Sequence, residues 1–225
     1  MKPLRVICLL LAALASTIAA YPALADTGEI GAGIKAGTPG IGPELTIGLT
    51  PFLNARAGYN ALHFDGSTTE SDIMYHYSMK LKSCPILLDL HPIGNSGFRI
   101  TSGIFINNNV LRATGAPQTT YTIGNTTYPA ADIGTLAGTV TFKHYAPFAG
   151  IGWGNAVGSK SSLSFAFDLG VIFQGSPDVA LAANGVVASD PLFKADLARE
   201  ISSVKSKISD IKYYPVLSLG LAYKF

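Results

Sequence analysis

The chain has 225 residues, of which 48% are hydrophobic and only 13% are charged, and its formal net charge at pH 7 is +2. A mean hydropathy of +0.33 is unusually high for a soluble secreted domain. The small net charge argues against a nucleic-acid partner, because binding to phosphates requires a strongly basic surface.

Residues 1–25 have the pattern of a secretory signal peptide. Lys2 and Arg5 supply the positive start, residues 6–20 form an apolar stretch, and Ala23-Leu-Ala25 fits an A-x-A cleavage site. A retained transmembrane anchor is the alternative, but the apolar run is short and is interrupted by hydroxyl residues. We therefore expect cleavage after residue 25 and a mature chain of residues 26–225, with fourteen basic and fourteen acidic residues.

No stretch of the mature chain approaches the roughly 18 apolar residues that a membrane-spanning helix needs. Apolar residues instead alternate with small or polar ones, which is the period of a β-strand between two unlike media. A β-barrel reconciles this pattern with the apolar composition, because its strands expose only every second side chain to lipid. Eight strands are predicted, near Glu29–Ala36, Pro43–Leu49, Leu53–Phe64, Ile73–Leu90, Phe98–Val110, Thr139–Trp153, Leu163–Phe173 and Tyr213–Phe225.

The connections between these strands alternate in length, as expected for a bacterial up-and-down antiparallel barrel. The second, fourth and sixth connections are short and rich in turn formers, which suits the periplasmic side: Thr50–Phe52, His91–Gly97 and Asn155–Ser162. The other connections are then extracellular, and two of them are long: Gly37–Gly42, Asp65–Asp72, Leu111–Gly138 and Gly175–Lys212.

Two strands depart from simple alternation. In Ile73–Leu90 the apolar residues change side after Pro85, and a one-residue slip would do this, so a β-bulge is predicted there. The sixth strand carries Gly150, Gly152 and Gly154. Alternating glycines leave room for bulkier neighbours in the lumen of a narrow barrel.

Charged residues on the alternate face of a strand cannot face hydrocarbon, so they are expected to face the lumen. The lumen candidates are Glu44, Arg56, Lys80, Asp89, Arg99, Asp168 and Lys224. At eight strands, side chains roughly fill a barrel. These residues therefore predict an ion-pair plug, with a narrow gated path for small polar solutes as the alternative.

Aromatic residues occupy the strand ends, where barrels carry interfacial girdles. The expected girdle residues are Phe98, Trp153, Tyr223 and Phe225 at the periplasmic end, and Phe173, Tyr213 and Tyr214 at the outer rim.

The last strand ends on an aromatic residue, and this ending resembles the closing strand of Gram-negative outer-membrane barrels that the barrel assembly machinery reads. Its signal residues would be Leu219, Leu221, Tyr223 and Phe225. The chain resembles small outer-membrane barrels of the OmpA/OmpX-type size class, and more narrowly a group of uncharacterised proteobacterial barrels. The resemblance runs through Arg56-Ala-Gly-Tyr-Asn60, Leu87-Leu-Asp-Leu-His-Pro92, Gly152-Trp-Gly-Asn155, Phe167-Asp-Leu-Gly170 and Phe173-Gln-Gly-Ser-Pro177. It implies an outer-membrane location among lipid and lipopolysaccharide, and no activity.

The two longest connections carry local structure of their own. Thr120–Tyr128 reads as a hairpin about Gly124-Asn125. A helix is expected from Ser189 or Asp190 to Lys212, with Pro191 in its first turn and one apolar stripe. The stripe is expected to cap the barrel rim or the hairpin. Alternatively, residues 111–138 and 175–212 bind an extracellular partner or lipopolysaccharide.

No catalytic, cofactor or metal site is expected. His63, Asp65 and Ser67 could form a rim triad, but they enter a polar loop where such residues are common. The four histidines share no metal-ligand spacing. Cys84 is the one cysteine left after signal removal, which excludes an internal disulfide.

The sequence therefore favours a non-enzymatic outer-membrane barrel that serves envelope structure or surface interaction. A narrow channel or carrier is the first alternative, and a lipid-modifying enzyme is the second. A soluble lipocalin-like barrel is the rival fold, and the aromatic girdles argue against it.

Overall fold

A computed structural model describes residues 27–225, except for 71–72, 94–95, 117–118 and 159–160. The predicted signal peptide and its cleavage site lie outside the described residues. The strands are β1 (Ile30–Gly37), β2 (Gly40–Thr50), β3 (Leu53–Gly58), β4 (Asn60–Glu70), β5 (Ile73–Leu90), β6 (Phe98–Asn107), β7 (Val110–Ala116), β8 (Thr120–Ile123), β9 (Thr126–Pro129), β10 (Leu136–Thr141), β11 (Tyr145–Trp153), β12 (Leu163–Phe173), β13 (Asp178–Ala183) and β14 (Tyr213–Lys224).

Eight of these strands close into an antiparallel ring. The order is β1, β2, β3, β5, β6, β11, β12 and β14, and β14 pairs with β1. Closure leaves the ring without an unpaired edge, which a barrel in lipid requires. The predicted eight-stranded transmembrane barrel is confirmed.

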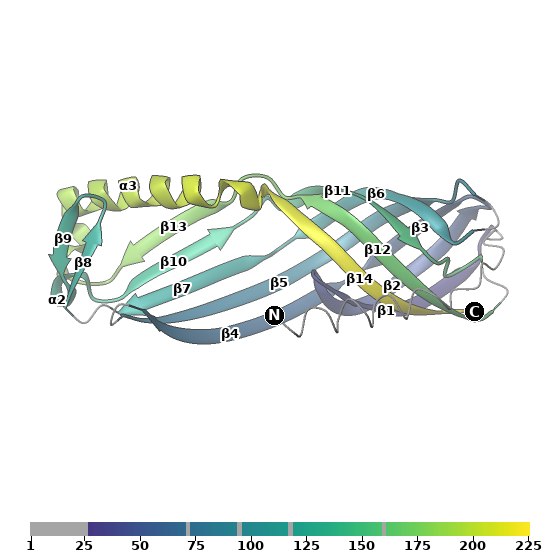
Figure 1. Cartoon of the computed structure of the whole chain (residues 1–225), viewed down its shortest axis with the longest axis horizontal. Helices are drawn as coiled ribbons and strands as arrows, with labels where there is room; N and C mark the ends of the chain where they lie inside the picture. The colour runs from purple at the N-terminus through teal and green to yellow at the C-terminus, as the bar shows by residue number, and fades with distance from the viewer. Residues whose placement is uncertain (1–26, 71–72, 94–95, 117–118, 159–160) are drawn as a thin grey trace, which may run out of the picture.

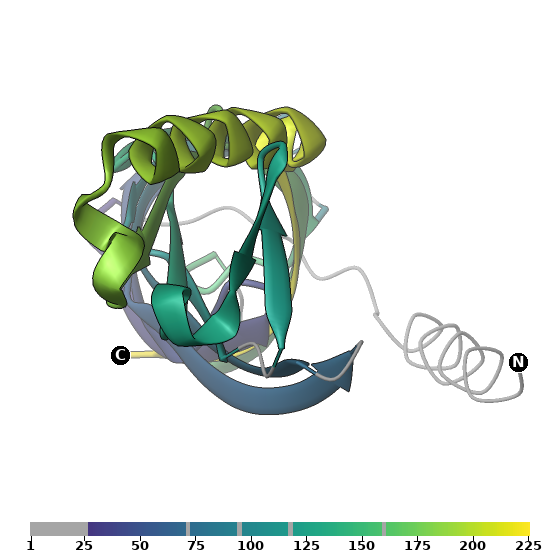
Figure 2. The ribbon, with the colours of Figure 1, turned by 90° about the vertical axis from the view of Figure 1, so that its left-hand side faces the viewer.

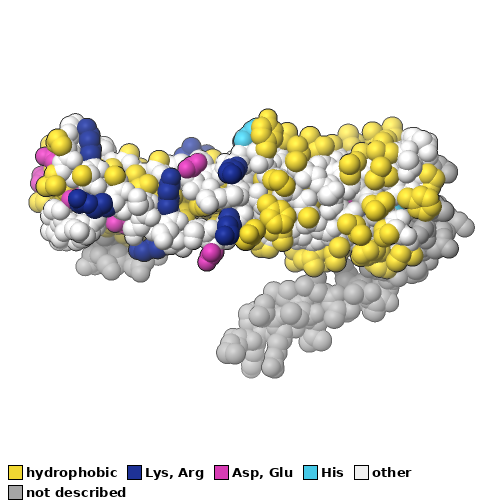
Figure 3. Space-filling view, turned by 90° about the horizontal axis from the view of Figure 1, so that it is seen from above, with side chains coloured by type: hydrophobic (Ala, Val, Ile, Leu, Met, Phe, Trp, Pro, Cys, Tyr) yellow, Lys and Arg dark blue, Asp and Glu magenta, His cyan; other side chains and the backbone are white. Residues whose placement is uncertain are grey.

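The outer surface of the ring is an apolar belt. Along β12, for example, Phe165, Leu169 and Phe173 are 73%, 47% and 43% exposed, while Asp168 points inward and is 4% exposed. In Figure 3 hydrophobic side chains cover the barrel half of this face, whereas charged side chains gather on the other half. The 11 residues of β12 match the length of about 9–11 residues with which a tilted strand crosses a bilayer.

Beyond the ring, four further strands pair onto the long strand β5 and its neighbours and form an open sheet of five strands. Its order is β4, β5, β7, β10 and β13, and it extends well beyond the barrel along the long axis of the molecule (Figure 1). Much of what was expected to be loop at Asp65–Asp72, and parts of Leu111–Gly138 and Gly175–Lys212, is therefore strand. Pairing with the long strand β5 overrides the turn-forming residues of β4.

The far end of this open sheet is covered by a small cap. The cap comprises the β8–β9 hairpin, α2 (Ala130–Ile133), η1 (Val186–Ser189), α3 (Pro191–Lys207) and η2 (Ser209–Lys212). Ile123, Ile133 and Phe193 form its buried centre. As Figure 2 shows, the hairpin stands across the end of the molecule and α3 runs along one side of the open sheet. The predicted hairpin and helix are confirmed, and the N-terminal part of the helix packs on the hairpin as expected. The helix is shorter than predicted, because α3 ends at Lys207 and η2 forms the last turn before β14.

Two polar contacts fix the cap. The Asp190 carboxylate accepts hydrogen bonds from the Leu192 and Phe193 amides at 2.7 and 3.2 Å, which caps the N-terminus of α3. The fully buried Asp196 on α3 accepts a hydrogen bond from the Tyr128 hydroxyl at 2.8 Å. Hydrogen bonds from Thr126 and Tyr128 lower the pKa of the Asp196 carboxyl.

The bulge predicted near Pro85 is wrong. The register of β5 with β3 and β4 on one side, and with β6 and β7 on the other, continues without a shift. Odd-numbered residues face inward throughout, from Leu81 (4% exposed) to Asp89 (1%). The apolar side changes because the surroundings change: outward-facing Lys80 and Lys82 lie beyond the belt, whereas outward-facing Ile86 lies in it.

Within the described residues, the helices are all too short or too polar to cross a membrane.

Candidate functional site

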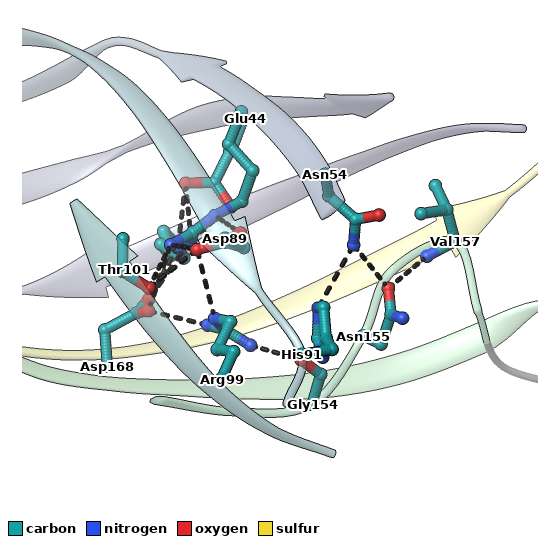
Figure 4. A network of polar contacts seen from close by, with 12 residues as sticks. Glu44, Asn54, Asp89, His91, Arg99, Thr101, Gly154, Asn155, Val157 and Asp168 are labelled. Carbon is teal, nitrogen blue, oxygen red and sulfur yellow. Dashed lines mark hydrogen bonds and ion pairs between the residues drawn. The ribbon is translucent and has the colours of Figure 1, made fainter. Parts of the chain in front are cut away.

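The lumen is crossed at mid-height by a layer of six charged side chains, which we call the charged layer (Figure 4 shows most of it). Each comes from a different strand of the ring, at an inward-facing position. The cations are Lys35, Arg56 and Arg99, and the anions are Glu44, Asp89 and Asp168. Three positive charges therefore meet three negative charges, and the layer is neutral as a whole.

Arg56 is the centre of the charged layer. Its Nη2 donates to Asp89 Oδ1 at 2.9 Å and to Asp168 Oδ1 at 3.2 Å, and its Nη1 donates to Glu44 Oε1 at 3.2 Å. A second contact joins its Nε to Asp89. The side chain is only 4% exposed. One guanidinium thus satisfies three carboxylates, a use for which its planar fork of donors is suited.

Asp168 ties the remaining cations to this centre. Its Oδ1 accepts from Arg99 Nη2 at 2.6 Å, and its Oδ2 lies 2.7 Å from Lys35 Nζ. Lys35 Nζ also donates to Glu44 Oε2 at 2.7 Å. Each charge has at least one opposite partner, which a buried charge needs if it is not to be strongly destabilising.

Glycines on the lumen face make room for the large side chains. A Cβ on Gly152 would lie 2.9 Å from Arg99 Nε, and one on Gly170 would lie 2.5 Å from the Phe148 ring. A Cβ on Gly150 would lie 2.8 Å from the same ring. The expectation that glycines of the sixth strand accommodate bulkier lumen residues is confirmed for Gly150 and Gly152. Gly154 follows β11 with a φ of +102°, and a Cβ there would meet backbone atoms of β12 instead.

On the periplasmic side of the charged layer lies a layer of neutral polar groups. Asn54 Nδ2 donates to Asn155 Oδ1 at 2.9 Å and lies 3.2 Å from His91 Nε2. The amide of Val157 also donates to Asn155 Oδ1, at 3.1 Å. All four residues are buried, so His91 after β5 and Asn155 and Val157 after β11 fill this end of the lumen (Figure 4).

On the extracellular side the lumen is apolar. Leu87, Phe105, Ala146, Phe148, Ile172 and Val216 form a packed cluster with exposures of 5% or less. The rings of Phe105 and Phe148 have centroids 5.3 Å apart. We call this cluster the apolar layer. Sequence reasoning assigned polar residues to the lumen and missed this layer, because its members look like ordinary strand residues.

The gaps between the layers are small. One void of about 20 Å³ lies between the charged layer and the periplasmic layer, and one of about 30 Å³ lies between the charged and apolar layers. A void of that size has room for about one water molecule or a few. Neither is a continuous path for a solute.

The structure places the predicted lumen residues as follows. Glu44, Arg56, Asp89, Arg99 and Asp168 come together in the charged layer, and Lys224 lies at the periplasmic end, where it pairs with Glu29 at 2.8 Å. The prediction for Lys80 is wrong, since its side chain is exposed on the outer face of β5. Lys35 was missed, although it alternates with the outward-facing Ile34 and Ala36.

The predicted girdle residues are divided between the two ends of the belt. Phe173 and Tyr213 are exposed at the outer end with ring centroids 5.8 Å apart, and Tyr223 and Phe225 form a similar pair at 5.5 Å at the other end. Phe98 and Trp153 are half-buried and pair with each other. The prediction for Tyr214 is wrong: it packs against the apolar layer, and its hydroxyl donates to the Thr38 carbonyl at 2.6 Å.

The outward-facing side chains of β14 include Leu219, Leu221 and Tyr223, which are 46%, 38% and 50% exposed, and Phe225, directly after the strand, is 79% exposed.

His63 and Asp65 do contact each other, together with Ser78 rather than Ser67. His63 Nε2 lies 3.0 Å from Asp65 Oδ1 and 3.4 Å from Ser78 Oγ. Hydrogen bonds from Ser78 and His63 lower the pKa of the Asp65 carboxyl. Hydroxyl and carboxylate share one ring nitrogen, whereas a catalytic triad uses opposite nitrogens. The cluster, exposed on the outer face of β4 and β5, therefore lacks the geometry of an activated serine.

Among the described residues, no group of three or more His, Cys, Asp or Glu side chains could hold a metal ion. Cys84 is a free, half-buried thiol.

Comparison with known proteins adds support for the fold. No protein-family model and no curated protein matches the chain. Among solved structures, CarO2 of Acinetobacter baumannii is similar, with a TM-score of 0.60 and 22% identity over 89% of this chain and 100% of that one. CarO of Acinetobacter baumannii has a TM-score of 0.57 and 20% identity over 87% of this chain and 97% of that one. At these identities the likeness concerns the barrel fold alone.

Proposed function

We propose that this chain is an integral outer-membrane barrel with a sealed lumen, which serves envelope structure or surface interaction rather than transport or catalysis. The observation that carries this proposal is the charged layer, in which six ionised side chains neutralise one another across the full width of the lumen. A conducting pore would need such groups to face water instead of one another.

The apolar layer strengthens the seal. A hydrated ion that reached the extracellular side of the charged layer would have to cross packed side chains such as Phe105 and Phe148, whose exposures are 3% and 4%. Moving a charge into such surroundings costs several kcal/mol even after relaxation. A narrow channel or carrier, the alternative function, would therefore require both layers to rearrange.

The outer-membrane location also belongs to this proposal. It is supported by the apolar belt, by the paired aromatics at its two ends and by the outward-facing apolar residues of β14. The partners we propose are lipid and lipopolysaccharide at the belt, the barrel assembly machinery at the last strand, and an extracellular ligand at residues 111–138 and 175–212. We propose no catalytic role for His63, because of its shared contact geometry.

The test is the conductance of refolded residues 26–225 in a planar lipid bilayer. We expect insertion without discrete current steps. A variant with both layers weakened, Arg56→Ala with Phe148→Ala, serves as the positive control and should conduct if it still migrates as a folded, heat-modifiable barrel. Discrete, salt-dependent openings of the unaltered protein would overturn the sealed-lumen proposal and favour the channel.

A further inference from the structure

The open sheet beyond the barrel has an apolar inner face next to its edge strand β4. Paired residues of antiparallel strands share a face, so Leu62 lies beside the inward-facing Leu81, and Phe64 lies beside Met79. Tyr77 follows on the same face, and its ring centroid is 6.1 Å from that of Phe64. The opposite face of β4 carries His63 and Asp65, both exposed, which is the pattern of a surface in water.

The part of this face formed by β4 and β5 is not covered by any residue that the structure describes. Leu62, Phe64 and Tyr77 are 42%, 52% and 40% exposed, whereas Leu81, which pairs with Leu62 but lies on the inner strand β5, is 4% exposed. The hairpin of the cap contacts this face at Tyr75, to which Tyr121 is hydrogen-bonded; burial and this bond raise the pKa of Tyr121 to about 12. A cluster of exposed apolar side chains marks a binding surface.

The lowest part of the barrel rim lies beside this face. The only described pairing between β2 and β4 is Ile41 with Ala61, so β4 is an edge strand from Leu62 onward. The β1–β2 turn ends at the level of the outer aromatic girdle, because Thr38 Oγ1 donates to the Pro215 carbonyl at 2.8 Å, two residues from Tyr213. Ile41, just below the turn, is 53% exposed in the belt. The apolar face is therefore continuous with the lipid-facing surface across a two-residue turn.

Positive charge lies close to the same edge. Lys80 and Lys82 are exposed on the outer face of β5, at the level of Leu62 and His63 on the neighbouring strand. This is the height at which outer-leaflet head groups meet a barrel, just above its aromatic girdle. Lysines there attract phosphate groups.

We propose that the apolar inner face of β4 and β5 holds an acyl chain of a phosphate-bearing lipid from the surrounding leaflet. The chain crosses the low rim at Thr38 and covers Leu62, Phe64 and Tyr77, while the head group stays beside Lys80 and Lys82. Transfer of the chain from the leaflet to this face exchanges one apolar environment for another. It also removes the exposed side chains from water, which stabilises the complex.

A fluorescent reporter at Phe64 tests this proposal. The chain has a single tryptophan, so Trp153→Phe gives a background without tryptophan into which Phe64→Trp is introduced. The folded protein is placed in vesicles of phosphatidylglycerol whose acyl chains carry bromine, a contact quencher. We expect the Phe64→Trp reporter to lose fluorescence as strongly as a reporter in the belt, Leu45→Trp, which replaces a side chain that is 55% exposed.

The matched control is His63→Trp, one residue away on the outer face of the same strand, which should keep its fluorescence. Reversing the charges of Lys80 and Lys82 to glutamate should reduce the quenching at Phe64→Trp and leave Leu45→Trp unchanged. Equal quenching of the Phe64→Trp and His63→Trp reporters would overturn the proposal. Quenching at Phe64→Trp by a soluble brominated amphiphile, but not by the vesicle lipid, would overturn the leaflet as the source.

Discussion

Replacing Arg56 by methionine removes the central charge of the lumen while keeping most of the side-chain volume. Three carboxylates then face only Lys35 and Arg99, so one negative charge is left without compensation. The side chains of Asp89, Asp168 and Glu44 are only 2%, 6% and 13% exposed, so water can do little to stabilise that charge. Breaking a buried ion pair by removing one partner costs about 3–5 kcal/mol, and we expect Arg56→Met to lose stability in this range.

The free energy of unfolding can be measured by denaturant titration in lipid vesicles, with Trp153 fluorescence as the signal. The matched control is Lys194→Met, because Lys194 is exposed on α3, outside the proposed lipid site and with no partner in the charged layer, and we expect a change within about 0.5 kcal/mol. Adding Asp89→Asn to Arg56→Met restores neutrality and keeps an acceptor for the Thr101 hydroxyl, which donates to Asp89 at 2.6 Å. This double variant should recover part of the loss.

Equal stability of the Arg56→Met and Lys194→Met variants would refute the reasoning. It would mean that water enters the charged layer freely and screens the unpaired carboxylate. A double variant less stable than Arg56→Met would also contradict it, because the loss would then come from missing hydrogen bonds rather than from net charge.

Three further outcomes are expected. Gly170→Ala should displace the Phe148 ring, 2.5 Å from the added carbon, and cost about 1–3 kcal/mol in the same titration. Asp190→Ala should remove the N-cap of α3 and cost about 1 kcal/mol, seen as faster amide exchange in that helix. The pKa of Asp196 is lowered in the folded cap, so its stabilising contribution is present above the ordinary aspartate pKa of about 3.9 and is lost as the pH falls through the lower folded value. Protease sensitivity of the cap should therefore rise in acid, and Asp196→Asn should abolish this pH dependence.

The ring of the barrel could be predicted because lipid and lumen impose opposite demands on neighbouring residues. Asp168 could be assigned to the lumen from its apolar neighbours alone. Phe167 and Leu169 face the opposite side of the strand from Asp168, and a carboxylate is too costly to place in hydrocarbon. Lys35 obeys the same rule, but the other inward positions of β1 are glycines, so the strand shows little contrast between its faces. A short strand with few side chains carries a weak signal.

The open sheet was less predictable because its existence depends on contacts distant in sequence. Gly66, Ser67 and Thr68 are turn formers by composition, yet they lie in a strand because β5 extends alongside them. β13 is short, and its pairing with β10 joins segments more than 30 residues apart. Such pairings are difficult to predict from the local sequence, because they depend on the tertiary context more than on β-propensity.

Along β5, the apolar residues move from one face of the strand to the other although the register with the neighbouring strands stays the same. In the barrel its outward residues are apolar, as at Ile86, and its inward residue Asp89 is charged. Beyond the barrel the outward residues Lys80 and Lys82 are charged, and the inward Leu81 is buried. Outward side chains are charged where they face water and apolar where they face lipid. The change from lysine to isoleucine on the outer face of β5 therefore places the membrane surface between Lys82 and Ile86. That is the position of Cys84, a half-buried thiol whose neighbours on the outer face are a lysine in water and an isoleucine in lipid.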